Sequence, residues 1–192
     1  GGIVFNYSGI VGNYDELYGE MQVYGLNDFD SYEKLDSDLE FCFDLDSKAL
    51  YLYSEKGNPA KRFSSIDISD SPNIVQGSSE DVTIDNLMIV FGGGHGVGSY
   101  TVKNRKVQNC IFAWIGGSVL KGFNGGNVTR YGNAVEVFGG CDGYYVYDNW
   151  CYQIYDTGIT HQYSDNDKTI KMDNIEYRGN LVEYCHWSIE YY

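Results

Sequence analysis

Two short sequence markers recur four times, in the same order, over the second half of the chain. The first marker is an asparagine followed by an apolar residue, and its copies begin at Asn86, Asn109, Asn149 and Asn180. The second is a β-branched residue between small or polar neighbours, and its copies are centred on Val97, Val135, Ile159 and Ile189. A pattern that recurs in a fixed order indicates a structure built from repeated units.

Each repeat has the composition of a coil of short strands. Successive asparagines lie 23, 40 and 31 residues apart, and the longest interval contains the glycine-rich segment 116–132. The intervening stretches are rich in Val, Ile, Tyr and Phe, and no amphipathic helix of useful length fits between the markers. Asparagine suits the bends, because it tolerates a left-handed backbone and can bond to its copies on stacked coils. We therefore predict an all-β fold, a right-handed parallel β-helix of about four to five coils.

Strand alternation assigns the residues beside each aliphatic centre to the outer face. One predicted outer column contains Gly96, Ala134, Gly158 and Ser188. The other contains Gly98, Glu136, Thr160 and Glu190. We expect these columns to form a shallow, exposed floor that is open to a ligand. The alternative is that the small residues only let a neighbouring loop pack closely.

The chain divides into a cap region, residues 1–62, and the coils, residues 63–192. Alternation over about residues 40–53 predicts an antiparallel hairpin in the cap, and residues 63–68 are expected to be the first strand of the stack. Short helical turns are expected at 14–20 and at 31–35, the second capped by Asp30 or Ser31. Residues 188–192 stop within a repeat, so we expect further sequence, a partner chain or self-association to cover the open coil.

Charge and composition exclude several classes of function. The net charge of −14 and the lack of a basic patch disfavour nucleic acid, and a polyanionic substrate would need a bridging cation. Five cysteines show no paired metal-ligand spacing, and no apolar run is long enough to span a membrane. No cofactor or metal site is predicted, because His95 and His161 lack zinc-site spacing and residues 165–167 lack the rest of a calcium loop.

Two carboxylates of the second outer column are the leading catalytic candidates. Glu136 and Glu190 flank Thr160, so two strand spacings would separate them by about 9–10 Å. That is at the upper edge of the roughly 6.5–9.5 Å expected of inverting glycoside hydrolases. Asp156 is a third candidate carboxylate, and His161 is a candidate acid or base. A histidine at a strand end also fits a purely structural role.

Candidate substrate-binding residues surround these carboxylates. Arg130 and Tyr131 end the glycine-rich segment, a long loop beside a rigid strand. Arg130 would hold a ligand carboxylate or hydroxyls, or it would form an ion pair with Asp156 or Glu136. The remaining candidates are Asn133, Thr160, Gln162 and His95.

Several segments together resemble one known group of proteins. They are LYLYSEKGNPAKRFSSID, VTIDNLMIVFGGGHGV, WIGGS, TRYGNAVEV, YDTGITHQ and NLVEYCHWSIEYY. Over about residues 40–192 the chain looks like bacterial right-handed parallel β-helix proteins of the pectate-lyase-like superfamily. The resemblance implies a secreted or cell-surface protein, of the polysaccharide lyase or glycoside hydrolase kind, that acts on plant or host glycans. It implies no single catalytic set, because lyases and hydrolases in the superfamily use different residues.

Three functions remain open from the sequence. The leading one is a glycoside hydrolase in which two of Glu136, Asp156 and Glu190 act as acid and base. The second is a lyase or epimerase on a uronic acid polymer, with Arg130 and His161 or Tyr131 in the site and Ca²⁺ to offset the acidic charge. The third is a glycan-binding or structural β-helix without catalysis.

Overall fold

The chain is nearly all β-structure, and most of its strand pairs are parallel. The computed structural model describes residues 3–6, 12–13, 22–24, 31–44, 47–69, 73–119, 130–163 and 169–191. Within these ranges the helical elements are η1 (Tyr32–Lys34) and α2 (Pro59–Arg62), each a single turn. The Ser31 side chain accepts a bond from the Glu33 N–H, which confirms the turn predicted at 31–35. The turn predicted at 14–20 lies outside the described residues.

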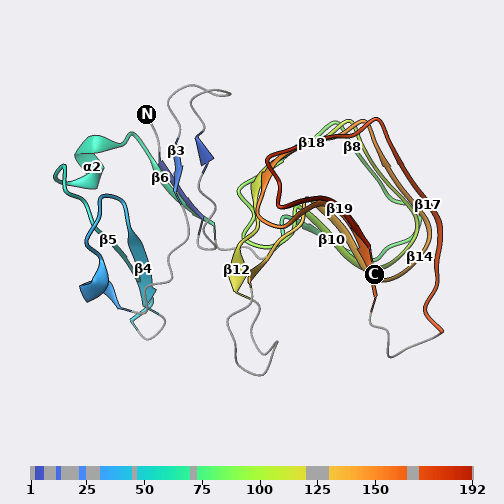
Figure 1. Ribbon diagram of the computed structural model, residues 1–192, viewed down its shortest axis with the longest axis horizontal. Helices are drawn as coiled ribbons and strands as arrows, with labels where there is room; N and C mark the ends of the chain where they lie inside the picture. The colour runs from blue at the N-terminus through green and yellow to red at the C-terminus, as the bar shows by residue number, and fades with distance from the viewer. Residues whose placement is uncertain are drawn as a thin grey trace.

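Two parallel sheets form the main body. The larger has the order β19-β16-β14-β10-β7, with β8 beside β10 and β17 beside β14. Its strands are β7 (Val75–Gln76), β8 (Thr83–Asp85), β10 (Val97–Gln108), β14 (Val135–Tyr147), β16 (Thr157–Gln162), β17 (Met172–Arg178) and β19 (Trp187–Tyr191). The smaller has the order β18-β15-β11-β9, with strands β9 (Met88–Val90), β11 (Ile111–Ile115), β15 (Trp150–Ile154) and β18 (Leu181–Glu183). The chain alternates between the sheets, so its successive passes stack and nearly superimpose in Figure 1.

The four aliphatic centres of the repeat share one register, as predicted. Val97 pairs with Val135, Val135 with Ile159, and Ile159 with Ile189, and Val75 extends this column to an earlier pass. Val97, Val135 and Ile159 are at most 1% exposed, whereas Ile189 on the last described pass is 51% exposed. The repeat was therefore located correctly from the sequence.

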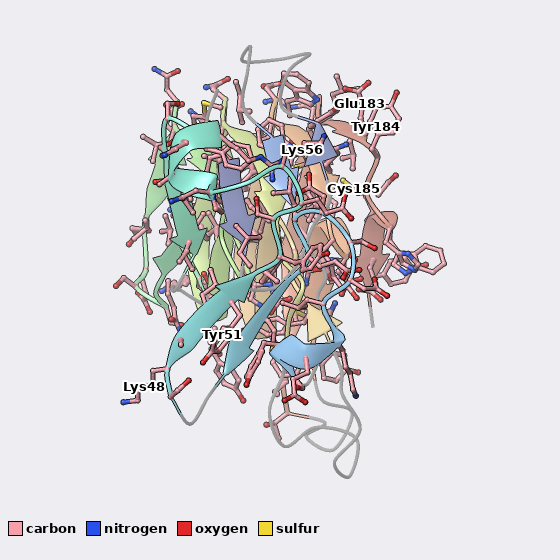
Figure 2. The ribbon with its side chains drawn as sticks, turned by 90° about the vertical axis from the view of Figure 1, so that its left-hand side faces the viewer. Lys48, Tyr51, Lys56, Glu183, Tyr184 and Cys185 are labelled. Carbon is pink, nitrogen blue, oxygen red and sulfur yellow. The ribbon has the colours of Figure 1, made fainter. Side chains whose placement is uncertain are left out.

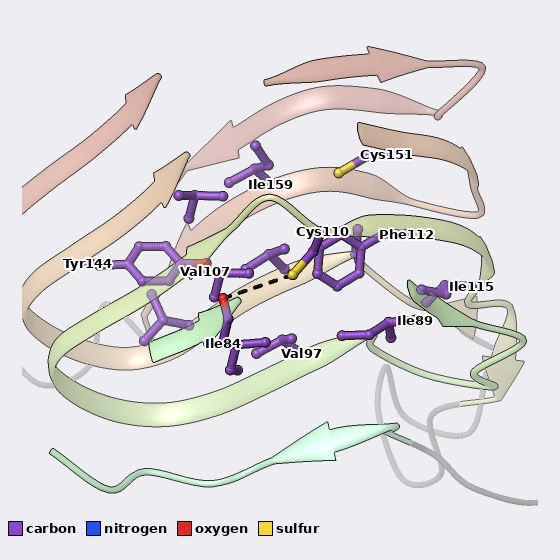
Figure 3. Close-up of a cluster of buried hydrophobic side chains, with 14 of the residues drawn as sticks. Ile84, Ile89, Val97, Val107, Cys110, Phe112, Ile115, Tyr144, Cys151 and Ile159 are labelled. Atoms are coloured by element: carbon purple, nitrogen blue, oxygen red, sulfur yellow. Dashed lines mark hydrogen bonds between the residues drawn. The ribbon is translucent and has the colours of Figure 1, made fainter. Parts of the chain in front are cut away.

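Apolar side chains from both sheets fill the space between them. Phe112 and Ile115 from β11 meet Val107 from β10 and Tyr144 from β14 in one buried cluster (Figure 3). Each large apolar side chain buried in this way contributes roughly 1.5–3 kcal/mol. Cys110 lies in the same cluster, with its Sγ 3.9 Å from the Ile84 carbonyl oxygen, and all five cysteines are free thiols.

Gly96, Ala134 and Gly158 of the column of small residues lie toward the interior, so their prediction as outward-facing residues was wrong, while Ser188 on the last described pass is exposed. Ala134 is fully buried in the core cluster. A Cβ on Gly96 would lie 2.9 Å from side-chain atoms of Phe112 and Ile115, and one on Gly158 would meet Val182 at 2.6 Å. Gly96 and Ala134 occupy the bend before their strands begin, where the chain turns a corner and strict alternation of faces does not apply.

The asparagine markers occupy two neighbouring columns at a bend. Asn86 and Asn109 align with each other and have left-handed backbones, with φ of 58° and 52°. Asn149 and Asn180 align one position later, where the Asn149 Nδ2 donates to the Asn180 Oδ1 at 3.0 Å. The predicted ladder therefore forms between Asn149 and Asn180, while the single column of four asparagines expected from the sequence was wrong.

The N-terminal strands form separate sheets. β4 (Phe41–Asp44) and β5 (Ala49–Leu52) make the predicted antiparallel hairpin, with Lys48 at its turn (Figure 2). The remaining strands here, in the sheet order β2-β3-β1-β6, are β2 (Gly12–Asn13), β3 (Gln22–Tyr24), β1 (Ile3–Asn6) and β6 (Ile66–Ser69). β6 pairs with β1, so the segment expected to begin the stack belongs to another sheet. Figure 1 shows this sheet and the hairpin beside the stacked passes, and the capping role of residues 1–62 stays a prediction.

The glycine-rich segment begins and ends in a short antiparallel pair. β12 (Ser118–Val119) pairs with β13 (Arg130–Tyr131), and residues 120–129 between them lie outside the described part of the chain. The Gly117 N–H also donates to the Tyr131 carbonyl at 2.7 Å. The pair places the backbone of Tyr131 four residues ahead of β14, whose second residue is the candidate carboxylate Glu136.

Candidate functional site

One column of residues projects from the outer face where the strands of the larger sheet begin. This outer column contains, in register, Gln76, Gly98, Glu136, Thr160 and Glu190. Each member follows an inward-facing aliphatic residue, so alternation turns it outward. Adjacent members lie about 4.8 Å apart along the stack, because they occupy neighbouring strands.

A second column, three positions before the outer column, anchors the passes to one another. It contains Asn73, His95, Asn133 and Thr157. The His95 N–H donates to the Asn73 Oδ1 at 2.9 Å, and the Thr157 N–H donates to the Asn133 Oδ1 at 2.9 Å. These bonds satisfy backbone donors at the bend and fix the two asparagine side chains. The fixed side chain of Asn133 also donates to Glu136, the leading catalytic candidate.

Glu136, His95 and Asn133 form a closed hydrogen-bonded group. The Asn133 N–H donates to the His95 Nδ1 at 3.1 Å, so a neutral His95 carries its proton on Nε2. That Nε2 lies 3.2 Å from the Glu136 Oε1, and both side chains are about nine-tenths buried, with 12% and 10% of their surface exposed. The Asn133 Nδ2 donates a short hydrogen bond to the other carboxyl oxygen of Glu136.

Burial shifts both titratable members of this group toward their neutral forms. It lowers the pKa of His95 to about 4 and raises the pKa of Glu136 to about 7. The Asn133 bond opposes the rise at Glu136, while the charges of Asp156 and Glu190 add to it. The contact between Glu136 and His95 is therefore a hydrogen bond from a neutral imidazole, although its length would also fit an ion pair. Glu136 changes its charge near neutral pH.

Glu190 belongs to a second hydrogen-bonded group on the next passes. Its Oε2 accepts bonds from the Thr157 Oγ1 at 3.1 Å and from the Gln162 Nε2 at 2.8 Å. The same Gln162 Nε2 donates to the Thr160 Oγ1 at 2.9 Å, so the polar atoms around Glu190 are linked. Burial first, and then the charge of Glu190, raises the pKa of Asp156. Three carboxyl groups thus influence one another across neighbouring passes.

A cleft opens on the side of Glu136 that faces the earlier passes. This first cleft has a volume of about 300 Å³. It is lined by Asn73, Gln76, Gly77, Ser78, His95, Gly98, Ser99, Tyr100, Glu136 and Phe138. Gly98 leaves space beside Glu136, because the residue one strand away in the outer column has no side chain. Tyr131 lies behind the cleft with its ring 5.0 Å from the His95 ring, and burial raises the pKa of its hydroxyl.

The structure brings most of the predicted site residues together. His95, Tyr131, Asn133 and Glu136 form one contiguous group. The second group, coupled to the first through charge, contains Thr160, Gln162, Glu190 and Asp156. The expected open floor was wrong, since Glu136 and Thr160 are both buried. His95 and Asn133 cover Glu136, and Gln162 bonds over Thr160.

Two predicted residues do not join this site as expected. His161 aligns with the core residue Val137 and faces inward, where its Nδ1 lies 2.8 Å from the Tyr177 hydroxyl and its ring stacks on Tyr191. Burial lowers the pKa of His161. The alternation rule separates adjacent residues Thr160 and His161, and it could have shown this in advance. Arg130 is placed only by its backbone, in β13, and its side chain lies outside what the structure describes.

Sequence reasoning missed the opposite wall of the cleft. Asn73, Gln76 and Ser78 come from an earlier pass that the four-copy repeat did not include, so the repeat did not point to them. Tyr100 and Phe138 each lie two residues after a member of the outer column. The alternation rule would have predicted that both aromatic side chains face outward.

The described residues contain no cluster of three or more His, Cys, Asp or Glu side chains suited to a metal ion. In the same part of the chain, no helix has the length and apolar character needed to cross a bilayer. No protein-family model, curated protein or solved structure matches the chain.

Proposed function

We propose that the stacked passes form a right-handed parallel β-helix and that the protein is a glycoside hydrolase, with Glu136 as the proton donor. The uniform parallel registers from β7 to β19 support the fold. The hand follows the strong preference of parallel crossover connections for right-handedness. The resemblance of residues 40–192 to secreted β-helix proteins supports a glycan substrate and a place of action outside the cell.

The observation that carries the proposal is a carboxyl group with a pKa of about 7 at the edge of a cleft. A general acid works best when its pKa lies near the operating pH, and burial is the common way to raise a carboxyl to that value. Glu136 also keeps a fixed orientation, because His95 and Asn133 hold its two oxygens. A neutral Glu136 would protonate the glycosidic oxygen of a sugar bound in the cleft.

Glu190 is the proposed base. Its Oε2 is held in place by hydrogen bonds from Thr157 and Gln162. It borders a hollow with Trp187 and Tyr191 and does not line the first cleft, so a sugar held at Glu136 must also extend past the buried Thr160 to meet this base. The two strand spacings between Glu136 and Glu190, about 10 Å between backbones, fit an inverting enzyme better than a retaining one.

The lyase alternative receives less support from the first cleft. Such an enzyme needs a cation beside the substrate carboxylate, and no Lys or Arg is among the described residues that line this cleft. The side chains there are neutral amides, hydroxyls and aromatic rings, which suit sugar hydroxyl groups and ring faces. These groups support a neutral glycan as the substrate.

The test is reducing-end release on a panel of purified glycans by the wild-type chain and by Glu136→Gln. We expect the variant to lose about 10²–10⁴-fold in kcat, the usual contribution of a general acid. In the wild type, kcat/KM should fall as the pH rises above about 7, because Glu136 then loses its proton. Glu33→Gln makes the same chemical change at an exposed residue in η1, and this control variant should keep the wild-type kcat. Full activity in Glu136→Gln would refute the assignment.

A further inference from the structure

A second cleft continues the first along the same three chain segments. It has a volume of about 450 Å³ and is lined by Ser78, Glu80, Thr101, Val102, Lys103, Gly139, Gly140, Cys141, Asp142, Thr169, Ile170 and Lys171. Ser78 lines both clefts. The first cleft borders residues 98–100 of β10 with Glu136 and Phe138 of β14, and the second borders 101–103 and 139–142 together with 169–171. The two clefts are therefore consecutive stretches of one groove that runs lengthwise beside β10 and β14.

A β-bulge lies at the junction of the two clefts. Ser99 pairs with Val137 and Thr101 pairs with Gly140, so Tyr100 faces two residues of β14, Phe138 and Gly139. Bulges of this kind re-aim side chains and are common next to active sites. Tyr100 is 65% exposed here, and its ring centre lies 6.1 Å from that of Phe138. The bulge thus presents an aromatic pair at the middle of the groove.

Wall and floor contacts keep the groove open on both sides of this pair. The Ser78 Oγ accepts bonds from the Tyr100 and Thr101 N–H groups at 3.2 and 3.3 Å, which fixes the wall shared by the clefts. Gly98 lines the first cleft and Gly139 lines the second. Gly139 has a φ of 130°, and a Cβ there would overlap the Tyr100 carbonyl oxygen, so the bulge requires glycine at this position.

The charges along the groove favour a ligand without net charge. Glu80 and Asp142 balance Lys103 and Lys171 in the second cleft, and the Lys103 Nζ lies 3.6 Å from a Glu80 oxygen. In the first cleft Glu136 is the acidic residue, and burial raises its pKa to about 7, which favours its neutral form. A polyuronate would place a carboxylate at each sugar against this balanced surface, without a surplus of cations to receive them.

We propose that the groove binds one extended neutral oligosaccharide across both clefts, with a sugar ring against Tyr100 and Phe138 at the junction. This deepens the proposed function, on which the glycan class rests, by naming the substrate as a neutral chain longer than the first cleft alone holds. The reacting bond lies at Glu136, at one end of the groove. Sugars on one side of that bond then occupy the second cleft, and their binding increases with chain length.

The test uses Glu136→Gln, so that bound ligands are not consumed. It is titrated by calorimetry with gluco-, xylo-, manno- and galacto-oligosaccharides from the disaccharide to the hexasaccharide, and with galacturonate oligomers of the same lengths. For at least one neutral series we expect affinity to rise with length and then level off. Tyr100→Ala and Phe138→Ala, each added to this background, should weaken the longest ligand about tenfold.

Tyr184→Ala is the matched control, since Tyr184 is 77% exposed and lies beyond β18, close to Glu183 and Cys185 (Figure 2). Circular dichroism checks that each variant is folded. Four results would each refute the proposed groove binding. They are affinity that does not depend on ligand length, an equal loss of affinity in Tyr184→Ala, binding of galacturonate oligomers alone, and no binding in any series.

The result also separates this inference from the hydrolase proposal. Length-dependent binding to Glu136→Gln, combined with no cleavage by the wild type, would leave the groove in place and refute the hydrolase. If the wild type cleaves glycans at a rate that does not depend on their chain length, the proposed groove binding is refuted and the hydrolase proposal is not.

Discussion

Glu136→Gln should change how the stability of the protein depends on pH, in a direction that the site geometry fixes. In the wild type, Glu136 and His95 have opposite effects. The folded pKa of His95, about 4, lies 2.5 units below its ordinary value of 6.5. Between about pH 4 and 6.5 His95 is therefore protonated in the unfolded chain and neutral in the folded chain. Because of this difference, His95 makes the stability of the protein rise with pH over that range.

Glu136 acts in the other direction. Its folded pKa, about 7, lies 2.5 units above its ordinary value of 4.5. The folded chain then holds a proton that the unfolded chain has released, so stability falls as the pH rises from about 4.5 to 7. At 1.36 kcal/mol per unit, each effect amounts to about 3 kcal/mol. Between about pH 4.5 and 6.5 the two slopes cancel in the wild type.

The variant removes only the falling contribution. Because the pKa of His95 is lowered by burial, the shift should persist when Glu136 becomes a neutral glutamine of similar size. As the pH rises from 4.5 to 7, the unfolding free energy of Glu136→Gln should therefore increase by about 3 kcal/mol relative to that of the wild type. Urea unfolding of both proteins at steps of half a pH unit measures this difference. Titrating groups that behave alike in the two proteins contribute equally to both free energies and do not affect the difference.

Glu33→Gln supplies the control, because it removes an exposed carboxylate from η1 without touching the site. Its difference from the wild type should stay within about 0.5 kcal/mol at every pH. The reasoning would be refuted by a Glu136→Gln difference that is constant across this pH range. A constant difference would mean that Glu136 has the same proton affinity in the folded and unfolded chains.

Three further perturbations test the frame and the charge coupling. Asn149→Ala should cost about 3 kcal/mol in urea unfolding, since it removes buried bonds to three neighbouring groups. Gly96→Ala should cost about 1–3 kcal/mol because its Cβ would lie 2.6 Å from a backbone oxygen, whereas Gly77→Ala, with nothing within 4 Å, should be nearly neutral. Glu190→Gln should move the high-pH limb of the kcat/KM profile to lower pH, because it removes a charge that helps to raise the pKa of Glu136. An unmoved limb with reduced kcat would instead indicate that Glu190 acts only as the base.

The periodic part of the fold was readable from the sequence because the interior repeats. Val97, Val135, Ile159 and Ile189 are spaced irregularly along the chain, yet they share one register, and the first three are buried at the same interior position. A buried column tolerates only apolar residues of similar size, so selection for packing leaves a visible pattern. The hairpin β4–β5 was equally readable, because alternation and a turn are local signals.

The errors arose where local rules meet tertiary contacts. The small residues at Gly96 and Ala134 lie in a bend, so an alternation rule that holds within strands assigned them to the wrong face. β6 looks like any other strand of the chain, and only its pairing with β1 removes it from the stack. Likewise the polar wall at Asn73 and Gln76 belongs to a pass outside the four predicted repeats, and its role depends on the pairing of β7 with β10.

The burial of Glu136 is the step that no sequence pattern could supply, and it also explains why the site needs the stack. A carboxyl group buried alone would cost several kcal/mol in its charged form. Here Asn133 donates to one oxygen and His95 to the other, and Asn133 holds both partners in place through a second bond to the His95 ring. His95 is itself fixed by Asn73 from the pass before, and Asn133 by Thr157 from the pass after. Four consecutive passes are thus required to position one proton, which is why its chemistry could be assigned only after their register was known.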